Sequence, residues 1–230
     1  MILGLDTATE HIRLALVEGE RVWTRTVPGE KGRSHSLVLL PALQAMLREA
    51  GRDPGALTGV ACCVGPGGFT GLRTGVATAE GLALAGLPTW GFSSFALWAE
   101  ALHLVGAGRC YWILLDGQRG EAFAQRWVDG HPEAALRVPL PRLQETLGAE
   151  CWWAPPTFAG RLPLPSAHRF LLDEDAPRAE DALVSLTRRL SQEPPESPLV
   201  PFYLRETDAE AHFPEASAHL PEAHRRGLPR

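Results

Sequence analysis

The sequence predicts an α/β protein that is built from two related lobes with mixed sheets. Apolar and polar residues alternate from Ile12 to Val27 around a Glu-Gly-Glu turn, which indicates antiparallel strands. A short apolar stretch, GVACCVG, is followed by a glycine-rich segment and a helical pattern, as in a crossover between parallel strands. Both halves of the chain also open with a strand that ends in Leu-Asp, at Asp6 and at Asp116.

The first half contains three strands and then helices. The strand ending at Asp6 and the two alternating strands predict a three-stranded antiparallel meander. Ser34 is expected to cap a helix from His35 to about Ala50, with Leu37, Leu40, Leu43 and Leu47 at helical spacing. A second helix is expected from Thr70 to about Ala85, and a third one, also capped by serine, over residues 93–105.

The pattern restarts after Gly106. A strand, a glycine-bounded turn and a second strand are expected over residues 110–128, followed by a short helix, a half-buried strand at Trp152-Trp153 and a helix near 180–191. Tyr203 and Arg205 are expected to dock the last structured segment onto a lobe. The predicted organisation is a first lobe over 1–105, a smaller second lobe over 106–205 and a disordered tail over 206–230.

Composition and charge narrow the class of protein. The formal net charge of -5, with no basic run longer than two residues, argues against independent binding to nucleic acid. The four cysteines have no CxxC spacing and lie in apolar surroundings, which indicates reduced core thiols. The start of the chain does not resemble a signal peptide, and the longest uncharged run is broken by glycines and Pro88. We therefore expect a soluble cytoplasmic protein without a membrane partner.

The glycine-rich segment after the GVACCVG strand matches no standard phosphate loop. A P-loop needs a lysine, and residues 65–72 contain none; Thr70 occupies the last glycine position of a dinucleotide fingerprint. A nucleophile elbow is also absent. Two interpretations remain open: an anion site made of backbone amides at a helix N-terminus, or a tight turn that lets the helix approach the sheet closely.

Four motifs occur in one order along the chain: LDTAT, GPGGFTGLRTG, LDGQRGE and VPFYLR. Together they resemble the TsaB (YeaZ) family, the bacterial subunit needed to make N6-threonylcarbamoyladenosine in tRNA. The resemblance covers residues 1–205 and is strongest in the first half. It implies the two-lobe fold of actin-like, Hsp70-like and sugar-kinase-like ATPases (ASKHA), with a ribonuclease-H-like strand order.

The resemblance also implies a nucleotide site. In that superfamily Asp6 would face Mg²⁺ or water beside the nucleotide phosphates, and the glycine-rich loop would be a phosphate turn. We expect no cofactor in the isolated chain, and ATP or ADP only at the interface of a complex. The expected weak nucleotide or anion site, shared with a partner, consists of Asp6, Gly65, Gly67, Gly68, Thr70 and Arg73.

The chain departs from the family pattern in three places. Gly68 stands where the family usually has serine, and Gly117 and Gln118 replace part of its second-lobe turn, which weakens a phosphate grip there. The related catalytic subunit, TsaD, binds a metal through a His-x-x-x-His helix, whereas the eight histidines here contain no such pair. His35 is therefore expected to be a surface or packing residue, and neither a metal site nor a catalytic residue is predicted.

Two functions remain from different classes. The first is a non-catalytic scaffold that dimerises with the TsaD-type subunit for modification of adenosine 37 in tRNAs reading ANN codons, inactive alone but required by the complex. Its partners would be TsaD, a TsaE-type ATPase and tRNA through the complex, and a second copy of itself. The alternative is a stand-alone ATP-dependent small-molecule kinase or a peptidase-like hydrolase of the same fold.

The partner interface is predicted on the first two helices. Apolar residues cover more than half of their circumference, which indicates burial on two sides. Either the first lobe itself covers both sides, or the helices pair with the same two helices of another subunit, in a homodimer and in the TsaD complex. The expected interface residues are Leu37, Leu40, Leu43, Leu47, Leu72, Val76 and Leu82.

Overall fold

The computed structural model describes residues 1–29, 35–106, 108–166 and 178–205. Its first sheet has the strand order β3-β2-β1-β4-β5. The strands β1, β2 and β3 form the predicted antiparallel meander, and β4 and β5 continue the sheet parallel to β1. This is the ribonuclease-H-like order. The bounds are β1 Ile2–Asp6, β2 Ile12–Glu18, β3 Arg21–Val27, β4 Gly59–Gly65 and β5 Thr89–Ser93.

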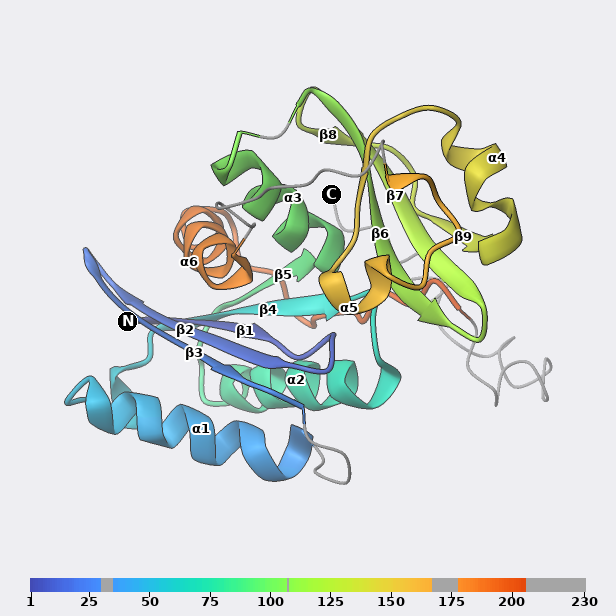
Figure 1. Ribbon diagram of the computed structural model, residues 1–230. Helices are drawn as coiled ribbons and strands as arrows, with labels where there is room; N and C mark the ends of the chain where they lie inside the picture. Colours follow the sequence, from blue (N-terminus) through green and yellow to red (C-terminus); the bar gives the residue numbers. More distant parts are fainter. Residues whose placement is uncertain (30–34, 107, 167–177, 206–230) are drawn as a thin grey trace.

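Helices cover both faces of the first sheet (Figure 1). The helices α1 (His35–Glu49) and α2 (Phe69–Ala83) lie on one face, and α3 (Ser94–Leu104) and α6 (Ala179–Leu190) lie on the other. A 3₁₀ turn, Pro54–Ala56, leads into β4. Ser93 caps α3 by accepting a hydrogen bond from the amide of Ala96, as predicted for this helix. The predicted cap of α1, Ser34, lies outside the described residues.

The second sheet has the order β10-β6-β7-β8, with β9 also pairing with β7. One face of β6 and β7 packs against the core of the first lobe, and the other face packs against two short helices and a 3₁₀ turn. The bounds are β6 Cys110–Gln118, β7 Glu121–Val128, β8 His131–Pro132, β9 Leu136–Pro139, the 3₁₀ turn Leu140–Arg142, α4 Leu143–Leu147, β10 Trp152–Trp153 and α5 Pro156–Ala159.

Three details of the sequence prediction are wrong. Trp152 and Trp153 were expected on a half-exposed strand, but both are buried, because the two faces of the second sheet are both covered. Of the four cysteines, only Cys62 and Cys63 are core thiols; Cys110 is half-buried and Cys151 is exposed. The third correction concerns the domain boundary.

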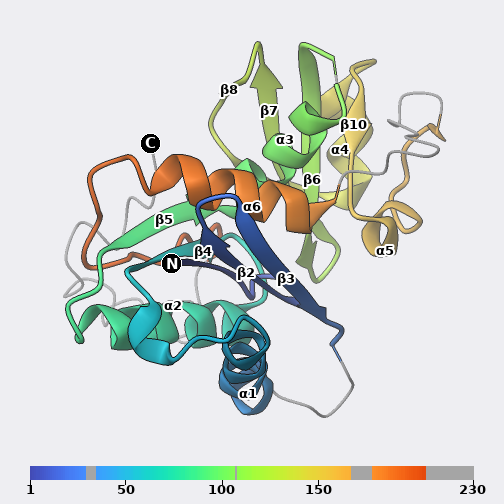
Figure 2. The same cartoon turned by 90° about the vertical axis from the view of Figure 1, so that its left-hand side faces the viewer.

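The predicted second lobe, residues 106–205, is divided between the two lobes. The chain returns to the first lobe in α6, which packs on β1, β2 and α3 (Figure 2). It stays there afterwards: the amide of Glu196 donates to the carbonyl of Thr89, and that of Phe202 to the carbonyl of Val64, both at 2.7 Å. The first lobe is therefore not one continuous stretch of the sequence, since it also contains α6 and residues 196–202. The predicted disordered tail, 206–230, lies outside the described residues.

Within the part of the chain that the structure describes, no helix combines the length and the apolar character needed to cross a bilayer.

Candidate functional site

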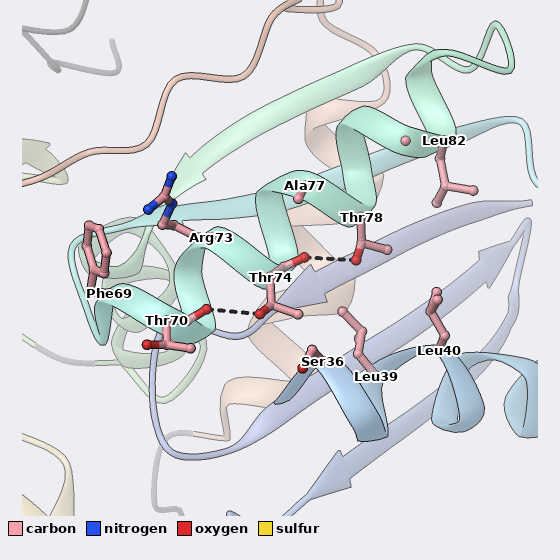
Figure 3. Close-up of a pocket in the computed structure, with 11 residues that line it drawn as sticks. Ser36, Leu39, Leu40, Phe69, Thr70, Arg73, Thr74, Ala77, Thr78 and Leu82 are labelled. Atoms are coloured by element: carbon pink, nitrogen blue, oxygen red, sulfur yellow. Dashed lines mark hydrogen bonds between the residues drawn. The ribbon is translucent and has the colours of Figure 1, made fainter. Parts of the chain in front are cut away.

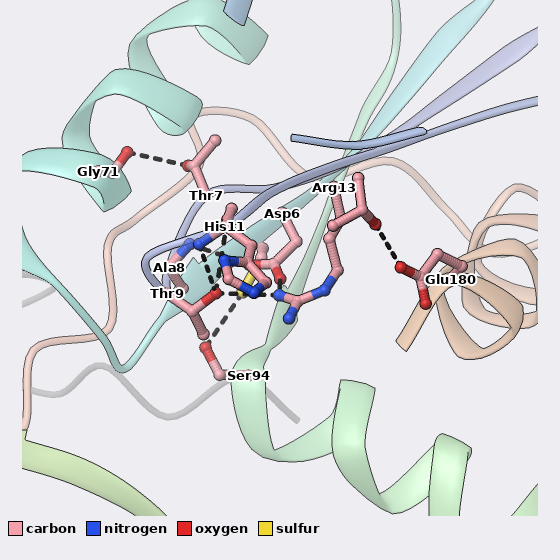
Figure 4. A network of polar contacts seen from close by, with 11 residues as sticks. Asp6, Thr7, Ala8, Thr9, His11, Arg13, Gly71, Ser94 and Glu180 are labelled. Atoms are coloured by element: carbon pink, nitrogen blue, oxygen red, sulfur yellow. Dashed lines mark hydrogen bonds and ion pairs between the residues drawn. The ribbon is translucent and has the colours of Figure 1, made fainter. Parts of the chain in front are cut away.

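The tip of β1 carries Asp6, which is buried and fully engaged by its own chain (Figure 4). One carboxylate oxygen accepts a hydrogen bond from the amide of Ala8 at 2.9 Å, and the other accepts from Arg13 Nη1 at 2.9 Å. Arg13 also donates to Thr9 Oγ1 and lies 5.5 Å from the centroid of the Trp98 ring. Asp6 is only 1% exposed, so the expectation that it faces water or Mg²⁺ is wrong.

This environment does not fit a nucleotide-bound metal ion. Arg13 already neutralises the Asp6 carboxylate, and a cation would have to compete with a buried ion pair. Among the described residues, no cluster of three metal-ligating side chains occurs elsewhere either. The β1 tip is therefore a structural ion pair, and no catalytic step is assigned to it.

The glycines of the loop and of α2 allow the helix to approach the β1 tip closely. A Cβ atom at Gly67 would lie 2.1 Å from the carbonyl oxygen of Ala8, and one at Gly71 would lie 2.3 Å from that of Thr7. At Gly75 it would lie 2.2 Å from the Thr7 hydroxyl. The amide of Gly68 donates to the Ala8 carbonyl at 2.7 Å. These contacts support the interpretation of close packing, because the glycines are needed whether or not an anion binds.

A cleft of about 560 Å³ lies between the glycine-rich loop, the β6–β7 turn and the last described segment. Gly67 and Arg73 line it from the first lobe, and Gly117 and Gln118 line it from the second. The guanidinium of Arg73 lies 5.0 Å from the centroid of the Phe69 ring, which in turn lies 5.4 Å from that of Tyr203.

Of the six residues predicted for a nucleotide site, only Gly67 and Arg73 line this cleft. Gly65 is buried at the end of β4, with its φ at +108° and the carbonyl of Phe202 close to it, and Asp6 is buried at the β1 tip. Gly68 is the N-cap of α2, and Thr70 lines a different groove.

The polar groups of the second-lobe turn are also occupied: Asp116 accepts from Arg161 at 2.7 Å and from the amide of Gln118. Arg205 pairs with Glu121, so the final segment docks as predicted.

A groove of about 760 Å³ runs between α1 and α2 on the outer face of the first lobe (Figure 3). Thr74 and Thr78 donate their hydroxyl hydrogen bonds to the carbonyls of Thr70 and Thr74 in their own helix, at 2.9 and 2.8 Å. These hydroxyls therefore need no partner elsewhere, and the groove is mainly apolar. The lining residues are Ser36, Leu39, Leu40, Phe69, Thr70, Arg73, Thr74, Ala77, Thr78, Gly81 and Leu82.

Only some of the predicted interface leucines lie on this surface. Leu40 and Leu82 line the groove, and Leu37 is 71% exposed on α1. The placement of the other four on a partner-facing surface is wrong: Leu43, Leu47, Leu72 and Val76 are buried in the core of the first lobe.

Sequence reasoning did not place the threonines and Ala77 of α2, which line the groove, on a partner surface, and it assigned Thr70 to a nucleotide site instead. Thr70, Thr74 and Thr78 follow each other at intervals of four, with Ala77 beside them, so they lie on one face of the helix. The available signal was a threonine at every fourth position of α2.

Comparisons with known proteins agree with this fold. The profile of the family "TsaD: tRNA N6-adenosine threonylcarbamoyltransferase" matches residues 19–132. The tRNA threonylcarbamoyladenosine biosynthesis protein TsaB of Escherichia coli K12 is 33% identical over 160 residues, which cover 64% of this chain and 68% of the relative. An uncharacterized protein of Mycobacterium tuberculosis H37Rv, Rv3421c, is 29% identical over 90% of this chain and 93% of its own length.

Among solved structures, a Pseudomonas aeruginosa protein described as similar to peptidase YeaZ superposes with a TM-score of 0.71. It is 24% identical, and the match covers 89% of this chain and 99% of that one. The fold thus defines a two-lobe α/β protein with a mixed sheet in each lobe, as predicted. Within that class, the chain belongs to the TsaB (YeaZ) family.

Proposed function

We propose that this chain is a non-catalytic scaffold subunit in the biosynthesis of threonylcarbamoyladenosine in tRNA, and that it pairs with a TsaD-type catalytic subunit through the groove between α1 and α2. The main evidence for this proposal is that apolar side chains are exposed along the groove: Leu40 is 51% and Phe69 is 43% exposed. Exposed apolar surface of this extent is typical of a protein–protein interface.

The groove suits a pair of helices from another subunit. Ala77, Gly81 and the threonines of α2 have small side chains. A partner helix can therefore approach α2 closely in the groove between Leu40 and Leu82. The same surface on a second copy would give a symmetric homodimer. We therefore infer that the homodimer and the TsaD complex compete for one surface.

The β1 tip supports a scaffold over a working kinase or hydrolase. An ATP-dependent enzyme of this fold would need a carboxylate accessible to metal-bound phosphate, whereas the Asp6 carboxylate is buried against Arg13. A nucleotide, ATP or ADP, would then bind only where the partner completes a site, with Arg73 at its edge. The alternative of a stand-alone kinase or peptidase-like hydrolase has no comparable observation in its favour.

The remaining parts of the proposal concern the whole complex. The target would be adenosine 37 of tRNAs reading ANN codons, in the cytoplasm, with a TsaE-type ATPase acting through the assembled complex. The net charge of -5 supports contact with tRNA through the complex rather than by this chain alone.

The test is a matched set of substitutions. Leu40→Glu and Ala77→Arg each place a charge in the groove, and Leu104→Glu is the control, because Leu104 is also 51% exposed but lies on α3. We expect both groove variants to remain folded, to elute as monomers in light scattering and to weaken binding of the TsaD-type subunit at least about tenfold, or about 1.4 kcal/mol.

The modified nucleoside made by the reconstituted complex should fall in parallel, and Leu104→Glu should match the unmodified protein in all three measurements. Wild-type affinity of both groove variants for the TsaD-type subunit would place the interface elsewhere. Threonylcarbamoyl transfer, kinase or peptidase turnover by the isolated chain would contradict the scaffold role itself.

A further inference from the structure

A second large cavity, of about 750 Å³, is lined by residues of both lobes, among them residues of α3 and α6. Its walls come from β5, α3, β6, β7, β8, α6 and the segment around Phe202, so it shares no element with the groove between α1 and α2. The volume falls within the range of about 300–1,000 Å³ that is typical of small-molecule sites. Four aromatic side chains line it: Phe92, Tyr111, Trp127 and Phe202.

Two residues of β7 that line this cavity each have a buried polar atom without a partner among the described residues: the acceptor Gln125 Oε1 and the donor Trp127 Nε1. Gln125 is only 8% exposed, and its Nε2 donates to the carbonyl of Glu133 at 2.9 Å, which fixes the amide orientation. The two residues stand two positions apart and therefore on one face of the strand. Buried polar groups are nearly always hydrogen-bonded. A bound molecule that supplies one donor and one acceptor would satisfy both atoms.

The charged groups at the rim neutralise each other. Arg109 pairs with Asp129 at 2.5 Å, and Arg189 pairs with Glu100 at 3.2 Å. Ser185 also donates to Glu100. Burial and the nearby Glu100 carboxylate raise the pKa of Tyr111, so its phenol is neutral at physiological pH. His103 is the remaining titratable side chain that lines the cavity. This balance of charge favours an uncharged ligand over a phosphate or a carboxylate.

We propose that this cavity binds a neutral, flat heterocycle with a lactam edge, that is, a ring N–H beside a carbonyl oxygen, as in uracil or hypoxanthine. The ring N–H would donate to Gln125 Oε1, and the carbonyl would accept from Trp127 Nε1. The aromatic walls would cover the faces of the ring. This site is separate from the partner groove and does not depend on the proposed scaffold role.

The test uses the full chain labelled with ¹⁵N, with uridine and inosine as probes. Trp127→Phe assigns the indole N–H signal of Trp127, and Trp23→Phe, on the distant strand β3, is the matched control. We expect at least one lactam nucleoside to shift the Trp127 signal with a Kd of about 1 mM or tighter. The forms methylated at the ring nitrogen, 3-methyluridine and 1-methylinosine, should bind at least about tenfold more weakly.

Two variants test the two proposed hydrogen bonds to the ligand. Gln125→Leu removes the acceptor but also the bond to Glu133, whereas Trp127→Phe leaves that bond in place and removes the indole donor together with part of the aromatic surface. Both should weaken binding, measured by calorimetry, while Trp23→Phe should not. Equal binding of the methylated and unmethylated nucleosides, or no response of the Trp127 signal to either lactam nucleoside, would overturn the proposal.

Discussion

Arg13 Nη1 lies 2.9 Å from Asp6 Oδ2, and both side chains are almost completely buried at the tip of β1. The pair joins neighbouring strands, since Asp6 of β1 stands opposite Arg13 of β2 in the sheet. Both oxygens of the Asp6 carboxylate already accept a hydrogen bond, one from the amide of Ala8 and one from Arg13. The same contact therefore joins two strands of the first lobe and keeps the carboxylate away from solvent.

Removing Arg13 should destabilise the protein strongly. Arg13→Ala leaves the Asp6 carboxylate buried without its partner, and we expect the free energy of unfolding in urea to fall by about 3–5 kcal/mol. The control is Arg25→Ala, because the pair of Arg25 with Glu49 is exposed to solvent and should contribute about 1 kcal/mol or less. A loss in Arg13→Ala no larger than in Arg25→Ala would show that the buried pair is not important for stability.

Two adjacent glycines should respond very differently to alanine. A Cβ atom at Gly67 would lie 2.1 Å from the Ala8 carbonyl oxygen, whereas the nearest atom to one at Gly68 is at 3.6 Å. Gly67→Ala must displace backbone, and we expect a loss of about 1–3 kcal/mol. Gly68→Ala and Gly68→Ser should change stability by about 0.5 kcal/mol or less. Equal thermal midpoints for Gly67→Ala and Gly68→Ala would contradict the packing interpretation.

The four thiols should fall into separate reactivity classes. Burial, with a smaller effect of the Asp6 charge, raises the pKa of the Cys62 and Cys63 thiols far above the usual range. Neither should react with a thiol reagent in the folded protein at neutral pH, while the exposed Cys151 should react fast. Mass spectrometry after brief alkylation gives the sites, and unfolding in urea should expose all four. Rapid native labelling of Cys62 would show that β4 is accessible.

Glu150 should contribute to the loss of stability in acid. A hydrogen bond from Arg126 lowers the pKa of Glu150 below its ordinary value of 4.5, with a further contribution from Trp112. Because the folded-state pKa is the lower one, this stabilisation is present above pH 4.5 and is lost as the pH falls through the folded-state pKa. Glu150→Gln should therefore show a shallower fall of unfolding free energy between neutral and acidic pH. A pH profile parallel to that of the unmodified protein would contradict this contribution.

The sequence predicted the local elements of the fold well, because its strands alternate and its helices have clear apolar stripes. It failed where the outcome depends on contacts between distant segments. Arg13 alternates with Ile12 and Leu14 and so would be expected to face solvent, but helices cover both faces of the sheet and the arginine is buried beside Asp6. The return of α6 to the first lobe has no local signal at all.

In the candidate interface, too, the sequence does not determine the outcome, because it does not show which side of α1 faces the sheet. In α1 the stripe beginning at Leu37 and the one beginning at Leu39 both have helical spacing, and only packing on the sheet decides between them. The structure buries Leu39, Leu43, Met46 and Leu47 and leaves Leu37 and Leu40 exposed. A helix that is apolar around most of its circumference does not reveal its rotation in the sequence.

The placement of α6 and of residues 196–202 on the first lobe has a consequence for synthesis on the ribosome. All five strands of the first sheet emerge before the second lobe, but one face of β1 and β2 stays bare until α6 has left the exit tunnel. The nascent first lobe therefore cannot complete its core as an independent unit, in contrast to proteins whose domains mature one after another. During that interval the chain exposes the apolar face of its first sheet, and the second lobe must be made before the first is finished.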